Sequence, residues 1–352
     1  GAADIPLVIA DASDPDSLAW MAAATQVVCS TVGPYAVYGE PTVAACVEAG
    51  TDYVDLTGEP QFVRAMIDRY HDAAVASGAR IVHSCGFDSI PSDLGTMFAQ
   101  SSMQAQHGVH AHTVALRVKA MKGGASGGTI ASMVNIMQEA SADPAIAAIL
   151  KDPYTLLPAG ERVGPHAPDR TSGELDKNFG QWVAPFVMEA INARIVRRSN
   201  AIQGYPYSRE FLYGEAILVG TGPTGRAKAA AIAAGGVLGA LGLANTPVRR
   251  LAEKVLPSAG TGPSPEARAN GFFDIRILAQ HPTDRSKDVT AKVTADRDPG
   301  YGATSRMLGE AALTLAMGES HVGGGSWTPA SALGDALVTR LIDHAGMTFS
   351  IV

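Results

Sequence analysis

Side chains that can exchange a proton gather at the ends of three short apolar runs of the sequence. Those side chains, with the carboxylates beside them, are Tyr35, Asp55, Glu59, His83, Cys85 and Asp88. Tyrosine, histidine, cysteine and the carboxylic acids are the residue types that act as general acids and bases. A buried structural cysteine or a histidine satisfied within the core is more common than a catalytic one. The position of each residue in the fold must therefore decide between the two roles.

The apolar runs have the composition of buried β-strands. Each is short, rich in β-branched residues and closed by glycine or proline, and the stretches between them have helical spacing. The runs are 27–32, 53–56 and 81–83, and 6–11 reads as a further strand before a helix that begins near 13–16. Such an alternation predicts a parallel α/β sheet. Ligands bind these sheets at the carboxyl ends of the strands, which is where the polar residues stand.

Composition argues against several classes of protein. The 352 residues are 46% hydrophobic and 17% charged, so the chain can bury a sizeable core and is long enough for two domains. A net charge of −7 argues against nucleic acid as a partner. Cys29, Cys46 and Cys85 lack metal-type spacing and indicate reduced thiols in the cytoplasm. Neither a spanning apolar stretch nor a signal-peptide pattern is present in the sequence.

Two glycine-rich segments have the composition of phosphate-binding turns. Gly220–Gly225 matches G-x-G-x-x-G after a strand-like run, but no second strand with an acidic end follows it, so a flexible turn is the better interpretation. Lys122–Thr129 leads into a predicted helix, whose free amides can attract a carboxylate, thioester or phosphate. Ser126 is the substrate-binding candidate there. A tight turn with Ser126 or Thr129 as the helix cap fits the pattern equally well.

The longer motifs of the chain resemble those of a known family. They are Cys29–Tyr35, Ala49–Glu59, Cys85–Asp93, Lys122–Thr129, Arg194–Asn200, Asp298–Tyr301 and Trp327–Ala332. Together they extend over nearly the whole chain. The sequence resembles the saccharopine dehydrogenase-like oxidoreductases and, among them, is most similar to the mycobacterial-type trans-acting enoyl reductases.

The resemblance implies a Rossmann domain that binds NADP(H) or NAD(H), joined to an α+β substrate domain, with no metal. The family's glycine-rich strand, turn and helix lie upstream of the part that resembles 6–11, so the chain resembles the family without its first β-α-β portion. Because that portion holds the pyrophosphate, we expect weak NADPH binding. The expected layout is an N-terminally truncated Rossmann domain over 1–106, a substrate domain over 107–303, and C-terminal helices over 304–352 that pack back on the first domain.

The resemblance and the chemistry together assign roles to single residues. The cofactor-binding candidates are Asp11, Thr31, Gly33, Pro34 and Tyr35. The catalytic candidates, as polarisers or proton donors at a double bond, are Tyr35, His83 and Cys85. The substrate-binding candidates are Asp55, Glu59, Asp88 and Ser126. Structural alternatives stay open: Asp11 fits a helix cap, and Glu59 fits a carboxylate at the start of a helix that begins near Pro60.

The second half of the chain is expected to form the substrate domain. Strand-like runs at 113–119, 211–219, 272–280 and 289–295 predict a mixed or antiparallel sheet, and helices are predicted over 304–317 and 329–344. Residues 154–178 read as a long surface loop. The small, apolar stretch 227–244 reads as a peripheral membrane contact or an entrance for an acyl substrate, or as a buried packing or homodimer helix.

Three functions are compatible with these features. The first is an NAD(P)H-dependent enoyl reductase that acts in trans on an unsaturated acyl or polyketide chain in lipid biosynthesis, with a polyketide synthase as partner. The second is a saccharopine-type amino-acid dehydrogenase, whose substrate carboxylates need arginines such as Arg194, Arg197 and Arg198. The third is a lipid- or protein-binding remnant without catalysis. The resemblance and the apolar stretch favour the first, and the sequence leaves the acyl substrate and the oligomeric state open.

Overall fold

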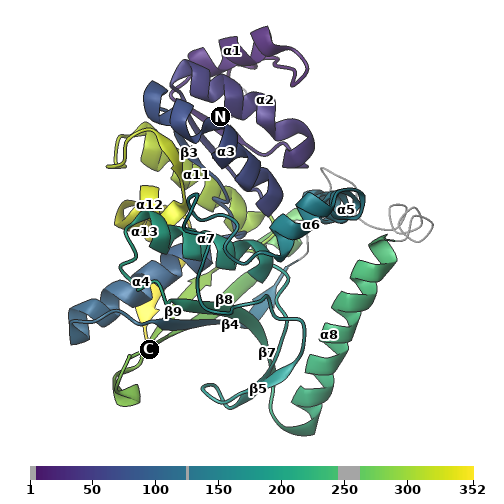
Figure 1. The fold of residues 1–352 in the computed structure, drawn as a ribbon, viewed down its shortest axis with the longest axis vertical. Helices are drawn as coiled ribbons and strands as arrows, with labels where there is room; N and C mark the ends of the chain where they lie inside the picture. Colours follow the sequence, from purple (N-terminus) through teal and green to yellow (C-terminus); the bar gives the residue numbers. More distant parts are fainter. Residues whose placement is uncertain (1–4, 124–126, 245–261) are drawn as a thin grey trace.

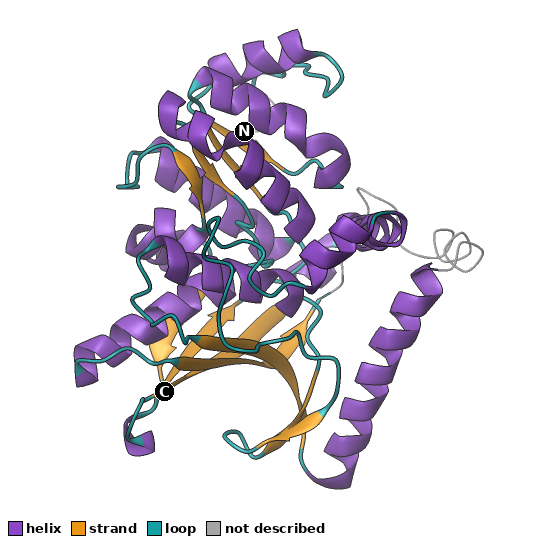
Figure 2. Cartoon of the chain, in the orientation of Figure 1, coloured by secondary structure: helices purple, strands orange, loops and turns teal. Residues whose placement is uncertain are grey.

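Two β-sheets form the framework of the molecule (Figures 1 and 2). The computed structural model describes residues 5–123, 127–244 and 262–352. Sheet A has the strand order β1-β2-β3-β10, and sheet B has the order β11-β9-β8-β4-β7-β6-β5. In Figure 2, sheet A lies among helices in one part of the molecule and sheet B forms a curved layer in the other.

Sheet A is the predicted parallel sheet. Its strands are β1 (Val27–Ser30), β2 (Asp52–Asp55), β3 (Arg80–Val82) and β10 (Gly325–Trp327), and neighbouring strands pair in parallel. Side chains alternate across it. Tyr53 and Ile81 join the core beneath the first three helices, whereas Val54 and Val82 join the core that includes the helix α11. These helices are α1 (Pro15–Ala23), α2 (Tyr35–Ala49), α3 (Pro60–Ser77) and α11 (Gly302–Ala316).

The strand predicted over 6–11 is wrong. Residues 6–10 are coil, and the side chains of Leu7 and Ile9 are 95% and 94% exposed. An apolar run becomes a strand only where a neighbouring strand completes its hydrogen bonds, and no strand of sheet A pairs with this segment. The helix predicted after it is confirmed, because α1 begins at Pro15 with the Asp14 side chain as its cap.

Sheet B is mixed, as one of the two predicted alternatives. Its central strand pairs in parallel with one neighbour, β7, and antiparallel with the other, β8. The strands are β4 (Thr113–Lys122), β5 (Glu174–Asp176), β6 (Gln181–Ala184), β7 (Leu212–Gly220), β8 (Phe272–Gln280), β9 (Val289–Ala295) and β11 (Met347–Ile351). The C-terminal part of the chain therefore supplies β10 to sheet A and β11 to sheet B.

Two helices cover sheet B on its inner side, α4 (Ile90–His107) and α7 (Glu189–Ile202). The predicted C-terminal helix over 329–344 is in fact two helices, α12 (Pro329–Ala332) and α13 (Gly334–His344). Gly334, the first residue of α13, has a φ of 47°, a left-handed conformation that interrupts a continuous helix. The helix α11 contacts β1 and β2, so this C-terminal element packs against sheet A.

The remaining elements lie outside these layers. They are α5 (Gly127–Ala142), α6 (Pro144–Lys151), α8 (Gly222–Ala244), α10 (Pro265–Ala269) and the 3₁₀ helix η2 (Arg285–Lys287). Figure 1 shows α8 extending along the outside of the molecule beside sheet B. In the ranges that the structure describes, no helix is both long enough and apolar enough to cross a membrane.

Two expectations about loops need correction. The segment 154–178 is not simply a surface loop, because it starts with Tyr154–Leu157, whose side chains are buried, and ends in β5. The stretch 220–225, expected as a flexible turn, is mostly the start of a helix, because β7 ends at Gly220 and α8 begins at Gly222. Gly220 and Gly222 have positive φ values, and a Cβ on Gly225 would lie 2.4 Å from the Gly220 carbonyl oxygen, so glycine is required for this close approach.

Candidate active site

A cavity of about 770 Å³ lies at the carboxyl ends of β1, β2 and β3. Residues that follow each strand line it, and α5, the start of α7 and α11 complete its wall. This is the edge of a parallel sheet at which ligand-binding groups are expected. Cavities of this size commonly hold small molecules or cofactors.

The wall of the cavity is mainly apolar. Met133 and Met137 of α5, Met188 and Ile191 at the start of α7, and Leu308 of α11 contribute to it. Methionine side chains adapt to irregular apolar ligands. Among the described residues that line the cavity, the one charged side chain is Asp88, and none is an arginine or a lysine.

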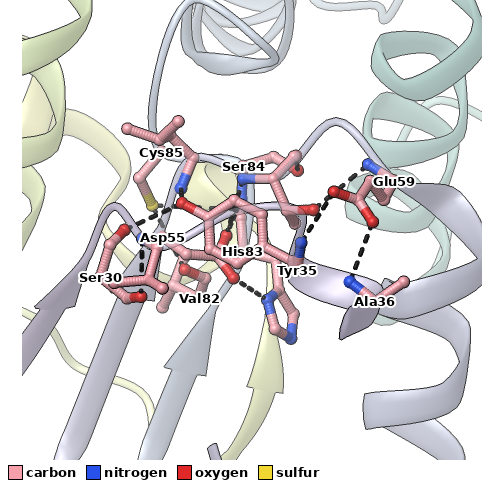
Figure 3. Close-up of polar contacts among 12 residues, drawn as sticks. Ser30, Tyr35, Ala36, Asp55, Glu59, Val82, His83, Ser84 and Cys85 are labelled. Atoms are coloured by element: carbon pink, nitrogen blue, oxygen red, sulfur yellow. Dashed lines mark hydrogen bonds and ion pairs between the residues drawn. The ribbon is translucent and has the colours of Figure 1, made fainter. Parts of the chain in front are cut away.

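Tyr35 lines the cavity, but its hydroxyl is engaged elsewhere. The hydroxyl donates to the Ser30 carbonyl oxygen at 3.0 Å and lies 3.5 Å from the Leu56 amide (Figure 3). Burial, with the nearby Asp55 carboxylate, raises the pKa of this phenol far above its ordinary value. The ring therefore shapes the cavity, while the hydroxyl ties the ends of β1 and β2 together.

Asp55 and His83 form a buried pair beside the cavity. The Nδ1 atom of His83 lies 2.7 Å from Oδ2 of Asp55, and Oδ1 accepts hydrogen bonds from the amides of Thr57 and Ser84 (Figure 3). The His83 ring packs against the ring of Phe62. Neither Asp55 nor His83 lines the cavity. Asp55 is the last residue of β2 and His83 follows β3, so their buried contact joins the ends of these two strands.

Cys85 is also beneath the cavity surface. Its thiol is fully buried and lies 3.5 Å from the Val82 carbonyl oxygen. Burial raises the pKa of this thiol well above its ordinary value, which keeps it in the unreactive protonated form. Another cysteine, Cys29 on β1, lines the cavity instead.

Glu59 directly precedes α3, but its carboxylate caps the start of α2. Its two carboxylate oxygens accept the amides of Tyr35 and Ala36, each at 2.9 Å, in the first turn of α2 (Figure 3). The Ser132 hydroxyl of α5 donates to the same carboxylate at 2.6 Å. Burial raises the pKa of Glu59. The sequence suggested a carboxylate at the start of α3, whereas the structure directs it to the start of α2.

Asp88 projects toward the cavity from the turn between β3 and α4. A Cβ atom on Gly58 or Gly86 would come within 3.1 Å of one of its carboxylate oxygens, so the two glycines leave the space that the carboxylate occupies. Burial, with the Asp55 and Glu59 carboxylates nearby, raises the pKa of Asp88 from 3.8 to about 7.

The residues expected to hold a nicotinamide cofactor are only partly brought together. Thr31, Gly33 and Tyr35 line one wall of the cavity, and a Cβ on Gly33 would lie 3.4 Å from the Tyr35 ring, so the glycine keeps this wall open. Pro34 precedes the first residue of α2. Asp11 lies outside the cavity and accepts hydrogen bonds from the amide and hydroxyl of Ser13. Ser126 lies outside the described residues.

Comparison with known proteins places the chain in a family, although no family model matches it. A Mycobacterium tuberculosis protein provisionally named a trans-acting enoyl reductase is 45% identical over 96% of this chain and 82% of that protein. Trans-acting enoyl reductases of Mycobacterium ulcerans and Mycobacterium bovis are 40% and 41% identical, each over 97% of this chain and 84% of the relative. The chain belongs to the trans-acting enoyl reductase family.

The family resemblance predicted from the motifs is thereby confirmed. Among solved structures, apo saccharopine dehydrogenase (L-Glu forming) from Saccharomyces cerevisiae is similar to this chain with a TM-score of 0.43 and 11% sequence identity, over 97% of this chain and 88% of that chain.

In this member of the trans-acting enoyl reductase family, the arginines of α7 do not face the cavity. Arg194 donates to the carbonyl oxygens of Leu150 and Asp152, Arg197 to that of Pro153, and Arg198 to that of Leu156. All three guanidinium groups are buried. They hold the end of α6 and the segment that follows it in place, and Leu150 of α6 lines the cavity.

Sequence reasoning missed much of the cavity wall. Ser132 of α5, Met188 before α7 and Thr304 of α11 line it, and none was a site candidate. The sequence did contain a signal for the regions of α5 and α11. The motifs at 122–129 and 298–301 were recognised as part of the resemblance, and the predicted helix after the first already contained the apolar residues of α5.

Proposed function

We propose that the protein is a nicotinamide-dependent oxidoreductase that reduces the carbon–carbon double bond of an uncharged, unsaturated acyl chain. The observation that carries this proposal is the apolar cavity at the strand ends, in which no described lining residue is basic. An amino-acid dehydrogenase would have to bind substrate carboxylates, for which arginine is the usual partner. The three arginines of α7 are engaged with main-chain carbonyls, so the amino-acid alternative has less support.

The family membership supports delivery of the acyl chain by another protein. The relatives from Mycobacterium ulcerans and Mycobacterium bovis are named trans-acting enoyl reductases. A chain tethered to a carrier has to enter the cavity from outside. Val187 and Ala190 both line the cavity and are exposed, which places them at an opening. We therefore propose a carrier-bound acyl thioester as substrate and a polyketide synthase as its source.

The residues of the cavity suggest how the chain would arrange the reaction. A reduced nicotinamide, when bound, supplies a hydride. Thr31, Gly33 and Tyr35 would hold its ring at the ends of β1 and β2, and the methionines of α5 would pack along the acyl chain and exclude water. Of the two nicotinamide cofactors, we favour NADPH from the family resemblance.

The test is turnover of model thioesters by the purified protein. NADPH or NADH is mixed with a short-chain or a long-chain 2-enoyl thioester, and oxidation of the cofactor is followed together with the mass of the product. We expect reduction of the long-chain substrate and no reaction with saccharopine. Isothermal titration with each nucleotide, in the same preparation, identifies the cofactor that binds.

A matched variant shows whether the cavity is the site. Ala190→Trp places an indole at the opening and should abolish reduction of the long-chain substrate, while nucleotide affinity is unchanged. Val163→Trp, at an exposed position outside the cavity wall, is the control. Turnover of saccharopine, or enoyl reduction that is indifferent to Ala190→Trp, would contradict the proposal.

A contact with membrane lipid is a separate proposal, supported by α8. Ile232, Val237 and Leu238 of this helix are exposed, and Arg226 and Lys228 stand near its beginning. Apolar side chains beside basic ones are typical of helices that lie on anionic membrane surfaces.

A further inference from the structure

Asp88 lines the cavity, and the proposed reduction has so far assigned it no role. It follows β3 in the turn Cys85–Ser89, at the same strand-end edge as Thr31, Gly33 and Tyr35. Reduction of an enoyl thioester needs a hydride at the β-carbon and a proton at the α-carbon. The nicotinamide supplies the first of these, so a proton donor has to face the same space.

The turn that carries Asp88 is fixed on both sides of the residue. The Phe87 amide donates to the Thr304 hydroxyl at 2.9 Å, and the Phe87 ring packs on Phe273 of sheet B. The Ser89 hydroxyl donates to the Asn192 side chain of α7 at 3.1 Å. A group held by neighbours in this way presents its proton in a constant position, which acid catalysis requires.

The surroundings of Asp88, with burial as the largest cause, keep part of its carboxyl protonated near neutral pH. Asp55 and Glu59 are the charged groups close enough to affect it, and both disfavour a negative charge on Asp88. No arginine, lysine or histidine in the described ranges forms an ion pair with it. The pKa of about 7 means that a substantial fraction of the carboxyl retains its proton at that pH.

The other candidates for this role are less well placed. The Tyr35 hydroxyl donates to the Ser30 carbonyl, and the Ser132 hydroxyl donates to Glu59. His83 and Cys85 do not line the cavity. Tyr301 lines it and is of a type that can donate a proton, so it has to be tested beside Asp88.

We propose that Asp88 is the catalytic acid, a role that rests on the proposed function: its O–H proton passes to the α-carbon of the acyl chain. Hydride addition at the β-carbon leaves an electron pair shared between the α-carbon and the thioester oxygen. That pair forms the new bond to hydrogen as the Asp88 O–H bond breaks, and the carboxylate then recovers a proton from water. The chain is reduced and no further reactant is needed.

The test compares Asp88→Asn with the unchanged enzyme over a range of pH. Deprotonation removes the acid, so the kcat of the unchanged enzyme should fall as the pH rises through about 7. Asp88→Asn should lower kcat on the order of 10²- to 10⁴-fold and abolish this pH dependence, with KM and nucleotide affinity nearly unchanged. Infrared difference spectra of the protein without substrate provide a readout that is independent of activity. The carboxylic acid signal that titrates near pH 7 should be smaller in Asp88→Asn than in the unchanged protein by the share of one carboxyl, because Asp93 and Glu215 also titrate near this pH.

Three further variants keep the test specific. Gly58→Ala brings a methyl group to 3.1 Å from the Asp88 carboxylate and no closer than 3.8 Å to any other neighbour, so it should lower kcat by displacing the acid. It also replaces Asp88→Asn if that variant fails to fold.

Asp93→Asn removes another buried carboxyl with a pKa of about 7 that does not line the cavity, and the pH profile of kcat should be unchanged in this variant. Tyr301→Phe changes another residue of the cavity wall that could donate a proton, and the fall of kcat through about pH 7 should persist in this variant whatever its rate.

The outcomes separate this inference from the proposed function. If the unchanged enzyme reduces enoyl thioesters and Asp88→Asn keeps both the rate and the pH profile, Asp88 is not the acid and the proposed function stands. A loss of turnover in Tyr301→Phe with Asp88→Asn unaffected assigns the role to Tyr301 and also overturns the inference. If the unchanged enzyme reduces no enoyl thioester, both proposals fail.

Discussion

Glu59 shows at the level of single residues how a candidate substrate ligand can be committed to the fold. Its carboxylate accepts two amides of the first turn of α2 and the Ser132 hydroxyl of α5. In Glu59→Gln only one side-chain oxygen remains to accept a hydrogen bond, and the new amide nitrogen faces a main-chain N–H donor of α2. We expect the free energy of unfolding to fall by about 1–3 kcal/mol, measured by urea denaturation. Glu40→Gln, in the exposed part of the same helix, should change it by less than about 1 kcal/mol. Equal losses in both variants would contradict the capping role.

The buried carboxyl of Asp93 predicts how stability depends on pH. It accepts the Ser199 hydroxyl and the Ala330 amide, and burial raises its pKa from 3.8 to about 7. Between these values the folded protein holds a proton that the unfolded chain has lost. The contribution of this group to stability is therefore complete below about pH 4 and is lost as the pH rises through about 7.

Urea denaturation at several pH values checks this expectation. The free energy of unfolding should fall between about pH 4 and about pH 7, and Asp93→Asn should flatten the curve. Part of the slope should remain, because burial also raises the pKa of Glu215 to about 7. An identical slope in Asp93→Asn would show that its carboxyl does not titrate in this range.

The candidate residues were found by their type and by their position after a strand. These two criteria do not predict which side chains face the cavity. Thr31, Gly33, Tyr35 and Asp88 line the cavity, whereas His83 and Cys85 stand at a similar strand end and do not. Which side chain turns toward the cavity depends on the local turn. Ser84, for example, has a φ of 62°, and its hydroxyl bonds to the Thr57 carbonyl. A single sequence does not reveal such a turn in advance.

At the level of elements, the packing of α4 on sheet B gives a sharp prediction. A Cβ on Gly95 would lie 2.4 Å from Cδ1 of Ile277 in β8. Gly95→Ala should therefore lower the free energy of unfolding by about 1–3 kcal/mol through overpacking, although alanine is the better helix former. Gly236→Ala in α8, where a Cβ meets nothing within 4 Å, should raise it by up to about 1 kcal/mol. The two changes are compared by thermal and urea denaturation, and opposite signs are expected. A stabilising Gly95→Ala would mean that α4 and β8 are farther apart.

The elements predicted well are those whose apolar periodicity matches their burial. The strands of sheet A from 27 to 82 and the main strands of sheet B belong to this group. The helix α7 was not predicted because its buried face carries Arg194, Arg197 and Arg198, a pattern typical of an exposed helix. These arginines can be buried because main-chain carbonyl oxygens of 150–156 accept hydrogen bonds from their guanidinium groups. The partner segment is distant in sequence, so no local pattern indicates the pairing.

At the scale of the whole molecule, the C-terminal part of the chain joins the two sheets. It adds β10 to sheet A and β11 to sheet B, and α11, which precedes both strands in the sequence, packs on β1 and β2 and lines the cavity. The cavity thus depends on residues from both ends of the sequence, such as Tyr35 and Leu308. The strand ends predict where it lies, but its apolar wall requires this long-range assembly.

The exterior of the molecule provides the last prediction, because α8 extends along the outside beside sheet B (Figure 1). The side chains of Val237 and Leu238 are 49% and 68% exposed. If they enter a lipid surface, replacing both with glutamate should reduce co-sedimentation with anionic phospholipid vesicles by at least about tenfold, since charge in the acyl boundary is costly. The same change should leave the melting temperature nearly unaltered, because exposed side chains contribute little to folding. Val163→Glu, at a side chain that is 73% exposed outside α8, is the control and should bind vesicles like the unchanged protein. Failure of the unchanged protein to bind vesicles, or equal binding by the α8 variant, would exclude this helix as a membrane contact.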